Sequence, residues 1–184
     1  MQRILDAAFD CVSGVGLGRT TVEDVARHAG LSRQTIYRYF PSKDVLILSL
    51  VLREEEKFLD GVRMAFATDP DLEEAVADGI EFCLRFAREH PLLDRLLATD
   101  SETLLPYLTI RSTPILMRAR TTVTELIASR VGGATGVLNE LVDVLVRVMV
   151  SYLLAPPERP VADVARDLAR IVTVTLDDRE AARP

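Results

Sequence analysis

Apolar residues recur every three or four positions along nearly the whole of this 184-residue chain, which is the spacing of one face of an α-helix. No stretch alternates apolar and polar residues in the way that a half-buried β-strand requires, and no internal repeat or low-complexity tract is present. With 48% apolar residues, the chain has ample material for a packed core. The sequence therefore predicts an all-α fold of about nine main helices.

Capping residues and helix breakers locate the ends of these predicted helices. Thr21 precedes one helix with Asp24 at the capping-box position, and Ser32 precedes the next. Pro91 and the Gly132-Gly133 pair each end a helix. The main predicted helices cover residues 2–12, 22–29, 33–40, 42–66, 70–90, 92–98, 113–131, 136–155 and 161–176, with a further short turn over 101–108.

The short predicted helix at 33–40 follows a tight glycine turn and has two faces of different character. Ile36 and Phe40 fall on one side, where they can pack against helix 2–12. The opposite face carries donors and an aromatic ring: Gln34, Thr35, Tyr37 and Arg38. Such side chains can read base edges, and neighbouring basic and tyrosine side chains suit phosphate oxygens. From the basic residues alone, the alternative of exposed charges on a small helical bundle stays open.

The string TTVEDVARHAGLSRQTIYRYFPSKDVL, at residues 20–46, resembles the DNA-binding signature of the TetR family of bacterial transcriptional repressors. The resemblance implies a three-helix helix-turn-helix domain over 1–46 and a helical effector-binding and dimerisation domain over 47–184. It implies base contacts from Arg33, Gln34, Thr35 and Arg38 and phosphate contacts from Thr21, Tyr37, Tyr39 and Lys43. The chain begins almost directly at its first helix, without the basic arm that many members carry, which leaves minor-groove contact open.

The distribution of charge restricts where such a chain can meet DNA. The whole chain has 22 Lys and Arg against 28 Asp and Glu, for a net charge of −6. Residues 1–46 hold six basic and five acidic side chains, so the acidic excess lies in the remainder. Because phosphate repels an acidic surface, contact with DNA must be local and confined to the N-terminal part.

The last two predicted helices, 136–155 and 161–176, resemble the pair that forms the dimer interface in TetR-like repressors. In the first of them, Asp143 and Arg147 have the spacing of an i,i+4 ion pair on a narrow polar stripe. In the second, we expect an inward stripe of Val161, Val164, Ala165, Leu168, Ile171 and Val172. The alternative is that both helices simply fill the core of one subunit. A dimer is also expected because one short recognition helix reads too few base pairs to be specific.

The residues that could line an effector pocket form the least specific part of the pattern. Apolar candidates are Phe82, Phe86, Tyr107, Met117, Met149 and Tyr152, and polar candidates are Cys83, Arg111 and Arg118. An aromatic or Met at helical spacing is far more often plain core, and that alternative stays open for each. We expect His90, beside Pro91, to be a helix-end cap or a surface group. The apolar bias suggests a hydrophobic or amphipathic effector.

The sequence also argues against several other functions. Two His, two distant Cys and no glycine-rich phosphate loop give no basis for a metal site, a cofactor or an enzyme. No segment resembles a signal peptide or a membrane span, and a reducing cytoplasm suits the unpaired Cys. We therefore expect a cytoplasmic homodimeric repressor, released from a palindromic operator DNA by a small hydrophobic or amphipathic effector. The alternative is a helical dimeric interaction module that does not read DNA.

Overall fold

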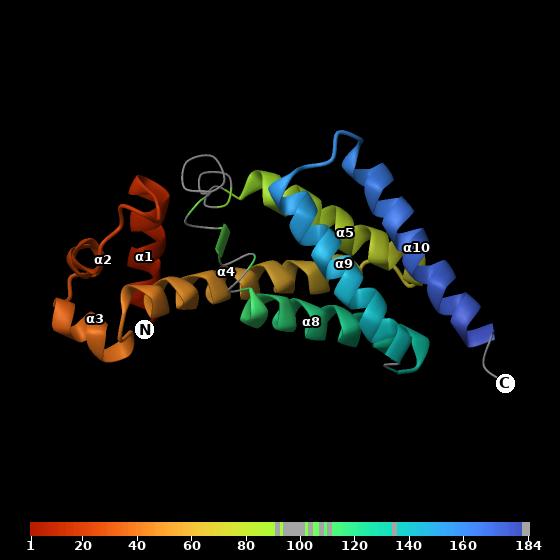
Figure 1. The fold of residues 1–184 in the computed structure, drawn as a ribbon, viewed down its shortest axis with the longest axis horizontal. Helices are drawn as coiled ribbons and strands as arrows, with labels where there is room; N and C mark the ends of the chain where they lie inside the picture. Colours follow the sequence, from red (N-terminus) through yellow and green to blue (C-terminus); the bar gives the residue numbers. More distant parts are fainter. Residues whose placement is uncertain are drawn as a thin grey trace. The chain divides into compact units, whose positions relative to one another are not determined.

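The computed structural model describes residues 1–90, 112–133 and 136–181, together with residues 93, 102, 105, 106 and 109. Over these residues the chain forms eight α-helices and no strand, which confirms the all-α prediction (Figure 1). They are α1 Gln2–Val15, α2 Val22–Ala29, α3 Arg33–Tyr39, α4 Lys43–Phe66, α5 Leu72–Glu89, α8 Thr113–Val131, α9 Gly136–Leu154 and α10 Val161–Ala181. The short helices expected over 92–98 and 101–108 fall largely outside the described residues.

The chain divides into two compact units. The first, here called the head unit, comprises Met1–Glu56 with Glu89–Ser112, and the second, the body unit, comprises Lys57–Arg88 with Thr113–Pro184. The division falls inside α4, so this helix contributes residues to both units. The boundary that the sequence suggested, between residues 46 and 47, stays a prediction.

The core of the head unit is formed by the inward faces of its short helices. Its deepest side chains, each at most 2% exposed, are Ile4, Ala8, Val12, Val25, Ala29, Ile36, Leu46, Ile47 and Leu50. This pattern follows from amphipathic helices that place apolar residues every three or four positions. On α2 the apolar residues Val22, Val25, Ala26 and Ala29 follow this spacing, and all four are buried.

Helix α1 is longer than its sequence suggested. The glycines after Val12 favoured a loop, but the helix continues to Val15. The backbone N–H of Gly16 donates to Val12 O at 2.9 Å, and Arg19 Nε donates to Val15 O at 2.9 Å. These bonds satisfy carbonyls that the last turn of a helix leaves without partners, and they stabilise the extra turn.

The core of the body unit draws on all five helical segments in that part of the chain. Helices α8 and α9 lie side by side, as do α9 and α10 (Figure 1). The buried side chains that pack together are Phe66, Ala75, Val76, Ala77, Ile80, Leu84, Ile127, Leu138, Val142, Leu145, Val146, Val164, Ala165, Ala169, Val172 and Leu176. Small residues such as Ala165 and Ala169, both at most 1% exposed, permit α10 to approach its neighbours closely.

Helix α10 corrects one sequence-based expectation. Ile171 was expected to face inward, yet its side chain is 57% exposed. Val172, only 2% exposed, occupies the inward stripe, and consecutive residues of an α-helix point about 100° apart. Val174, at 49%, is also exposed on this helix. The isolated chain therefore leaves apolar surface on α10 that its own core does not cover.

Candidate nucleic-acid interface

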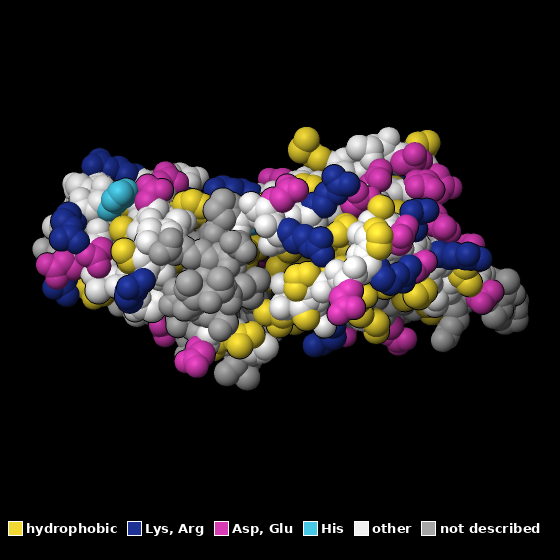
Figure 2. Space-filling model, turned by 90° about the horizontal axis from the view of Figure 1, so that it is seen from above, with side chains coloured by type: hydrophobic (Ala, Val, Ile, Leu, Met, Phe, Trp, Pro, Cys, Tyr) yellow, Lys and Arg dark blue, Asp and Glu magenta, His cyan; other side chains and the backbone are white. Residues whose placement is uncertain are grey.

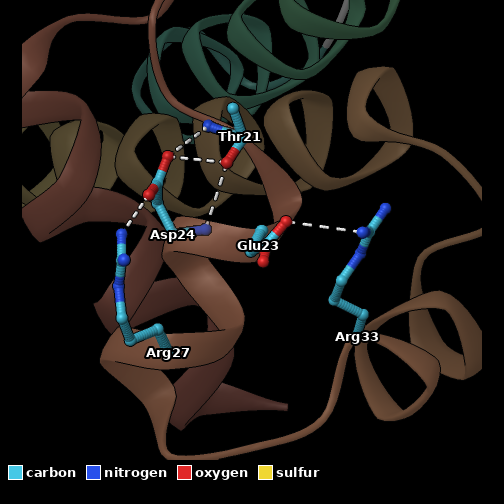
Figure 3. A network of polar contacts seen from close by, with 5 residues as sticks. All are labelled: Thr21, Glu23, Asp24, Arg27 and Arg33. Carbon is cyan, nitrogen blue, oxygen red and sulfur yellow. Dashed lines mark hydrogen bonds and ion pairs between the residues drawn. The ribbon is translucent and has the colours of Figure 1, made fainter.

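A capping box fixes the start of α2, as the sequence predicted. Thr21 Oγ1 accepts a hydrogen bond from the backbone N–H of Asp24 at 3.1 Å, and the backbone N–H of Thr21 donates to Asp24 Oδ2 at 3.1 Å (Figure 3). The Thr21 hydroxyl also donates to Asp24 Oδ2 at 2.6 Å. These hydrogen bonds, followed by the charge of Arg27, hold the pKa of Asp24 below its usual value. Both donors of Thr21 therefore point to Asp24 in the free protein.

A glycine turn connects α2 to α3. Gly30 adopts φ 61° and ψ 40°, the left-handed conformation that glycine enters without steric cost. Its N–H donates to Arg27 O at 3.1 Å, and the N–H of Leu31 donates to Ala26 O at 2.9 Å. Ser32 then caps α3, because its side chain accepts the N–H of Thr35 at 3.1 Å. The predicted helix, tight turn and helix are thus confirmed.

The two faces of α3 separate as the sequence predicted. Ile36 is 0% exposed, and Phe40, which directly follows the helix, is 4% exposed. Gln34, Tyr37 and Arg38 are exposed, and Thr35 is half-buried. Tyr39 is also exposed, and the guanidinium carbon of Arg38 lies 5.3 Å from the centroid of its ring. The face that carries hydrogen-bonding groups is therefore open to a ligand, and its contact with bases stays a prediction.

Two of the predicted DNA-contacting cations already have partners in the free protein. Lys43 Nζ donates to Leu17 O at 3.1 Å and to Gly18 O at 3.3 Å, which ties the start of α4 to the loop before α2. Arg33 Nη1 lies 3.4 Å from Glu23 Oε2 (Figure 3). Glu23 could not be predicted from the sequence, because its approach to Arg33 depends on how α2 and α3 pack and leaves no signal in residue spacing.

Charged side chains of both signs share the molecular surface. On the face in Figure 2, Lys and Arg side chains are interspersed with Asp and Glu and do not merge into one basic surface. This agrees with the near balance of charge within residues 1–46. Neither this face (Figure 2) nor the charge balance of residues 1–46 provides a broad positive surface, so we expect DNA binding to depend on a few placed contacts.

The candidate effector residues do not form one group. Phe82 and Phe86 on α5 lie together, with ring centroids 5.8 Å apart, and both contact Phe58 of α4, at 6.0 and 5.1 Å. Phe58 was not among the predicted residues, because it joins this aromatic cluster only through tertiary packing. Burial raises the pKa of the adjacent Cys83 to about 12, so its thiol stays protonated at neutral pH.

The remaining candidates have different surroundings. Met149 and Tyr152 are partly buried against the body core, Arg118 is half-buried, and Met117 is 60% exposed. Tyr107 and Arg111 lie outside the described residues. Their role in ligand binding stays a prediction.

His90 does not lie at the surface. Its side chain is 14% exposed, with its ring edge-on to Phe9 of α1 at 6.3 Å between centroids. Its Nε2 atom lies 3.9 Å from Glu54 Oε2. His90 directly follows the last residue of α5, and its Nδ1 accepts the backbone N–H of Leu93 at 3.4 Å. Of the two expected roles, the surface group was wrong, and the helix-end cap stays a prediction.

Two family models match successive parts of the chain. Residues 4–50 match the model described as bacterial regulatory proteins of the tetR family. Residues 71–174 match the model described as the C-terminal domain of bacterial tetracyclin repressor. The chain belongs to the TetR family. It is therefore a DNA-binding transcriptional regulator of the helix-turn-helix type.

Relatives agree with membership of the TetR family. The transcriptional regulator AlkX of Mycobacterium tuberculosis is 34% identical over 173 residues, which cover 92% of this chain and 82% of the relative. The TetR-family repressor AlkX from a Dietzia strain is 25% identical, with a TM-score of 0.76 over 96% of this chain and 97% of that chain. The structure of RolR without ligand is 16% identical, with a TM-score of 0.69 over 100% of this chain and 97% of that chain. It shares the fold. The two AlkX relatives are described as a transcriptional regulator and as a repressor.

The described residues also bear on metal sites and membrane spans. They contain no group of three or more His, Cys, Asp or Glu placed to hold a metal ion. None of the described helices combines the length and hydropathy that a membrane span requires.

Proposed function

We propose that this TetR-family chain is a dimeric repressor that binds a palindromic operator and releases it when a small hydrophobic or amphipathic molecule binds the body unit. The observation that carries this proposal is the outward face of α3. Gln34, Tyr37 and Arg38 are exposed there, while Ile36 anchors the opposite side in the core. This arrangement presents a short helix to the major groove with a fixed orientation.

The side chains on this face have complementary roles in the proposal. Arg33 and Arg38 suit guanine, Gln34 suits adenine, and the methyl group of Thr35 suits the methyl group of thymine. Tyr37, Tyr39, Lys43 and Thr21 contact phosphate and fix the register of the helix on the duplex. Since Lys43 already holds the loop at Leu17 and Gly18, its contact would also order that loop against the DNA backbone.

The proposed dimer forms through α9 and α10. Val144 on α9, at 58%, and Ile171 on α10, at 57%, are large apolar side chains exposed in the single chain. Figure 2 shows apolar side chains at the surface of the body unit among the charged ones. Pairing these helices with a second copy would bury this surface and place two heads on successive major grooves, about 34–36 Å apart.

The proposed effector binds near the aromatic cluster of Phe58, Phe82 and Phe86. The Dietzia relative is described as implicated in the biodegradation of n-alkanes. By this similarity, and because the cluster is wholly apolar, we propose a ligand with a hydrocarbon chain. Helix α4 contributes Phe58 to the cluster and its first turns to the head unit, so movement of α4 would shift the heads from the spacing that binds DNA. This function places the protein in the cytoplasm, with the chromosome.

The test of this function uses the full chain. Selection from a random pool of duplexes should yield an inverted repeat bound by two chains, and adding n-hexadecane should release it. Ile171→Asp should yield a monomer with weakened operator binding, whereas Met64→Asp, at a 74% exposed position of α4, should stay dimeric. A dimer that enriches no sequence would instead support an interaction module without DNA reading.

A further inference from the structure

Glu23 and Arg33 form an ion pair between the two helices of the helix-turn-helix. Glu23 is the second residue of α2 and Arg33 is the first residue of α3. Their charged groups approach to 3.4 Å, and their side chains are 69% and 59% exposed. Figure 3 shows that Asp24, the neighbouring carboxylate, is directed toward Thr21 and Arg27 instead. Of these two carboxylates, Glu23 is the one that pairs with the recognition helix.

We propose that Glu23 competes with DNA for Arg33 and so limits the affinity of the head unit for its operator. This inference rests on the proposed function, in which Arg33 contacts a base in the operator. In the free protein Glu23 lies against one terminal nitrogen of the guanidinium, so the pair must open before Arg33 can give both terminal nitrogens to DNA.

The pair reduces the affinity for DNA only where Arg33 leaves Glu23 to contact the DNA. On the operator, Arg33 gains two directed hydrogen bonds to guanine O6 and N7, so the pair opens and its full cost is subtracted from the free energy of binding. On any other sequence Arg33 gains only a phosphate contact, and the pair can stay closed. The pair therefore weakens operator binding more than non-specific binding, which lowers the ratio of the two affinities.

The geometry suits a contact that must be broken easily. At 3.4 Å the pair is longer than the ~2.7–2.9 Å of a strong charge-assisted hydrogen bond. Both side chains are mostly in solvent, so the effect on affinity should be no more than about fivefold. Since residues 1–46 hold only six basic side chains against five acidic ones, restraining one arginine still removes a large part of the attraction to phosphate.

The experiment measures the affinity of the full-length dimer for two 30-bp duplexes by fluorescence anisotropy at several salt concentrations. One duplex carries the selected operator and the other a random sequence. Glu23→Gln should tighten binding to the operator duplex by about three- to fivefold and change binding to the random duplex less. The slope of log K against log salt for the random duplex should steepen by about 0.9, because Arg33 now neutralises one further phosphate.

Two comparisons separate this role from a general change in charge. In an Arg33→Ala background, Glu23→Gln should lose most of its effect on the operator duplex. Glu74→Gln, which removes the same charge from an exposed position on α5, should leave both affinities unchanged. The proposal would be overturned if Glu23→Gln increased the affinity for both duplexes equally. It would also be overturned if the increase were the same with and without Arg33. If the wild-type chain prefers no sequence, the proposed function fails first. If it prefers one and Glu23→Gln has no effect, only this inference fails.

Discussion

The ring of Phe82 on α5 lies against the backbone of Gly61 on α4. A Cβ atom built on Gly61 would come within 2.1 Å of Phe82 Cζ and within 2.8 Å of two further ring atoms. No side chain larger than hydrogen fits there unless the ring moves. Phe82 is itself stacked on Phe58, with ring centroids 6.0 Å apart, so the absence of a side chain at Gly61 lets the two helices and the aromatic cluster pack closely.

Gly61→Ala should therefore destabilise the protein, although alanine normally favours a helix. We expect a loss of about 1–3 kcal/mol from displaced aromatic packing. Gly79→Ala is the matched control, because Gly79 is also inside a helix and its nearest neighbour, Val62 Cγ1, would be 3.9 Å from the new Cβ. That variant should gain up to ~1 kcal/mol. Urea denaturation measures both, and a stabilised Gly61→Ala protein would show that Phe82 is not seated as described.

Arg130 of α8 holds the end of α4. It donates to Pro70 O at 2.7 Å, to Asp69 O at 3.0 Å and to Phe66 O at 3.4 Å, and its guanidinium carbon lies 5.1 Å from the centroid of the Phe66 ring. Arg130→Lys should cost about 1 kcal/mol of unfolding free energy, because an ammonium group cannot reach these carbonyls and the ring together.

Arg166→Ala is the control for this prediction. Arg166 pairs with Asp163 one turn away on α10, with 64% of its side chain exposed, so its loss should cost at most ~0.5 kcal/mol. Thermal melts of both variants give the comparison. Equal effects would mean that Arg130 is an ordinary surface cation.

The capping box at Thr21 and Asp24 should make the head unit sensitive to acid. Because the pKa of Asp24 is lowered by its hydrogen bonds with Thr21, the ionised form stabilises the fold. This contribution is present above the unfolded pKa of about 3.9 and is lost as the pH falls through the lower folded value. Asp24→Asn should therefore be less stable than wild type at pH 7, and the difference should shrink below about pH 4. A difference that is constant from pH 7 to pH 2.5 would contradict this account.

The two thiols should differ in reactivity. Burial raises the pKa of Cys83 to about 12, so only about one thiol in 10⁴ is ionised at pH 8. Partial burial and the negative charges of Asp24 and Asp10 also raise the pKa of Cys11, but by less than burial raises that of Cys83. Reaction with a disulfide reagent at pH 8 should modify Cys11 first, so Cys11→Ser should remove the fast phase and Cys83→Ser should retain it. Fast labelling of Cys83 would show that its surroundings open in solution.

The sequence could predict those features that depend on local spacing. The helix ends at Val22, Ala29 and Phe66, the capping box and the buried Ile36 all follow from residues within a few positions of one another. The i,i+4 pair of Asp143 and Arg147 is likewise present, with Nε to Oδ2 at 3.0 Å.

Features that depend on tertiary packing could not be predicted in this way. The Asp143 carboxylate also binds Arg120 of α8 at 3.2 Å, and Glu23 meets Arg33 across a turn. Periodicity marks Ile171 as apolar but does not show whether the same chain covers it. The effector residues are the extreme case, since an apolar side chain in a core and one in a pocket have the same pattern.

Selection and sequencing of duplexes bound by the full chain, with wild type and Gln34→Ala compared in parallel, tests directly whether α3 reads DNA. Wild type should enrich an inverted repeat whose half-site centres lie about 10 bp, or a multiple of one helical turn, apart. Gln34→Ala should retain that repeat and its spacing but lose the preference for adenine at one position in each half-site. An unstructured pool from the wild-type protein, or identical repeats from both proteins, would contradict the account of how α3 reads DNA.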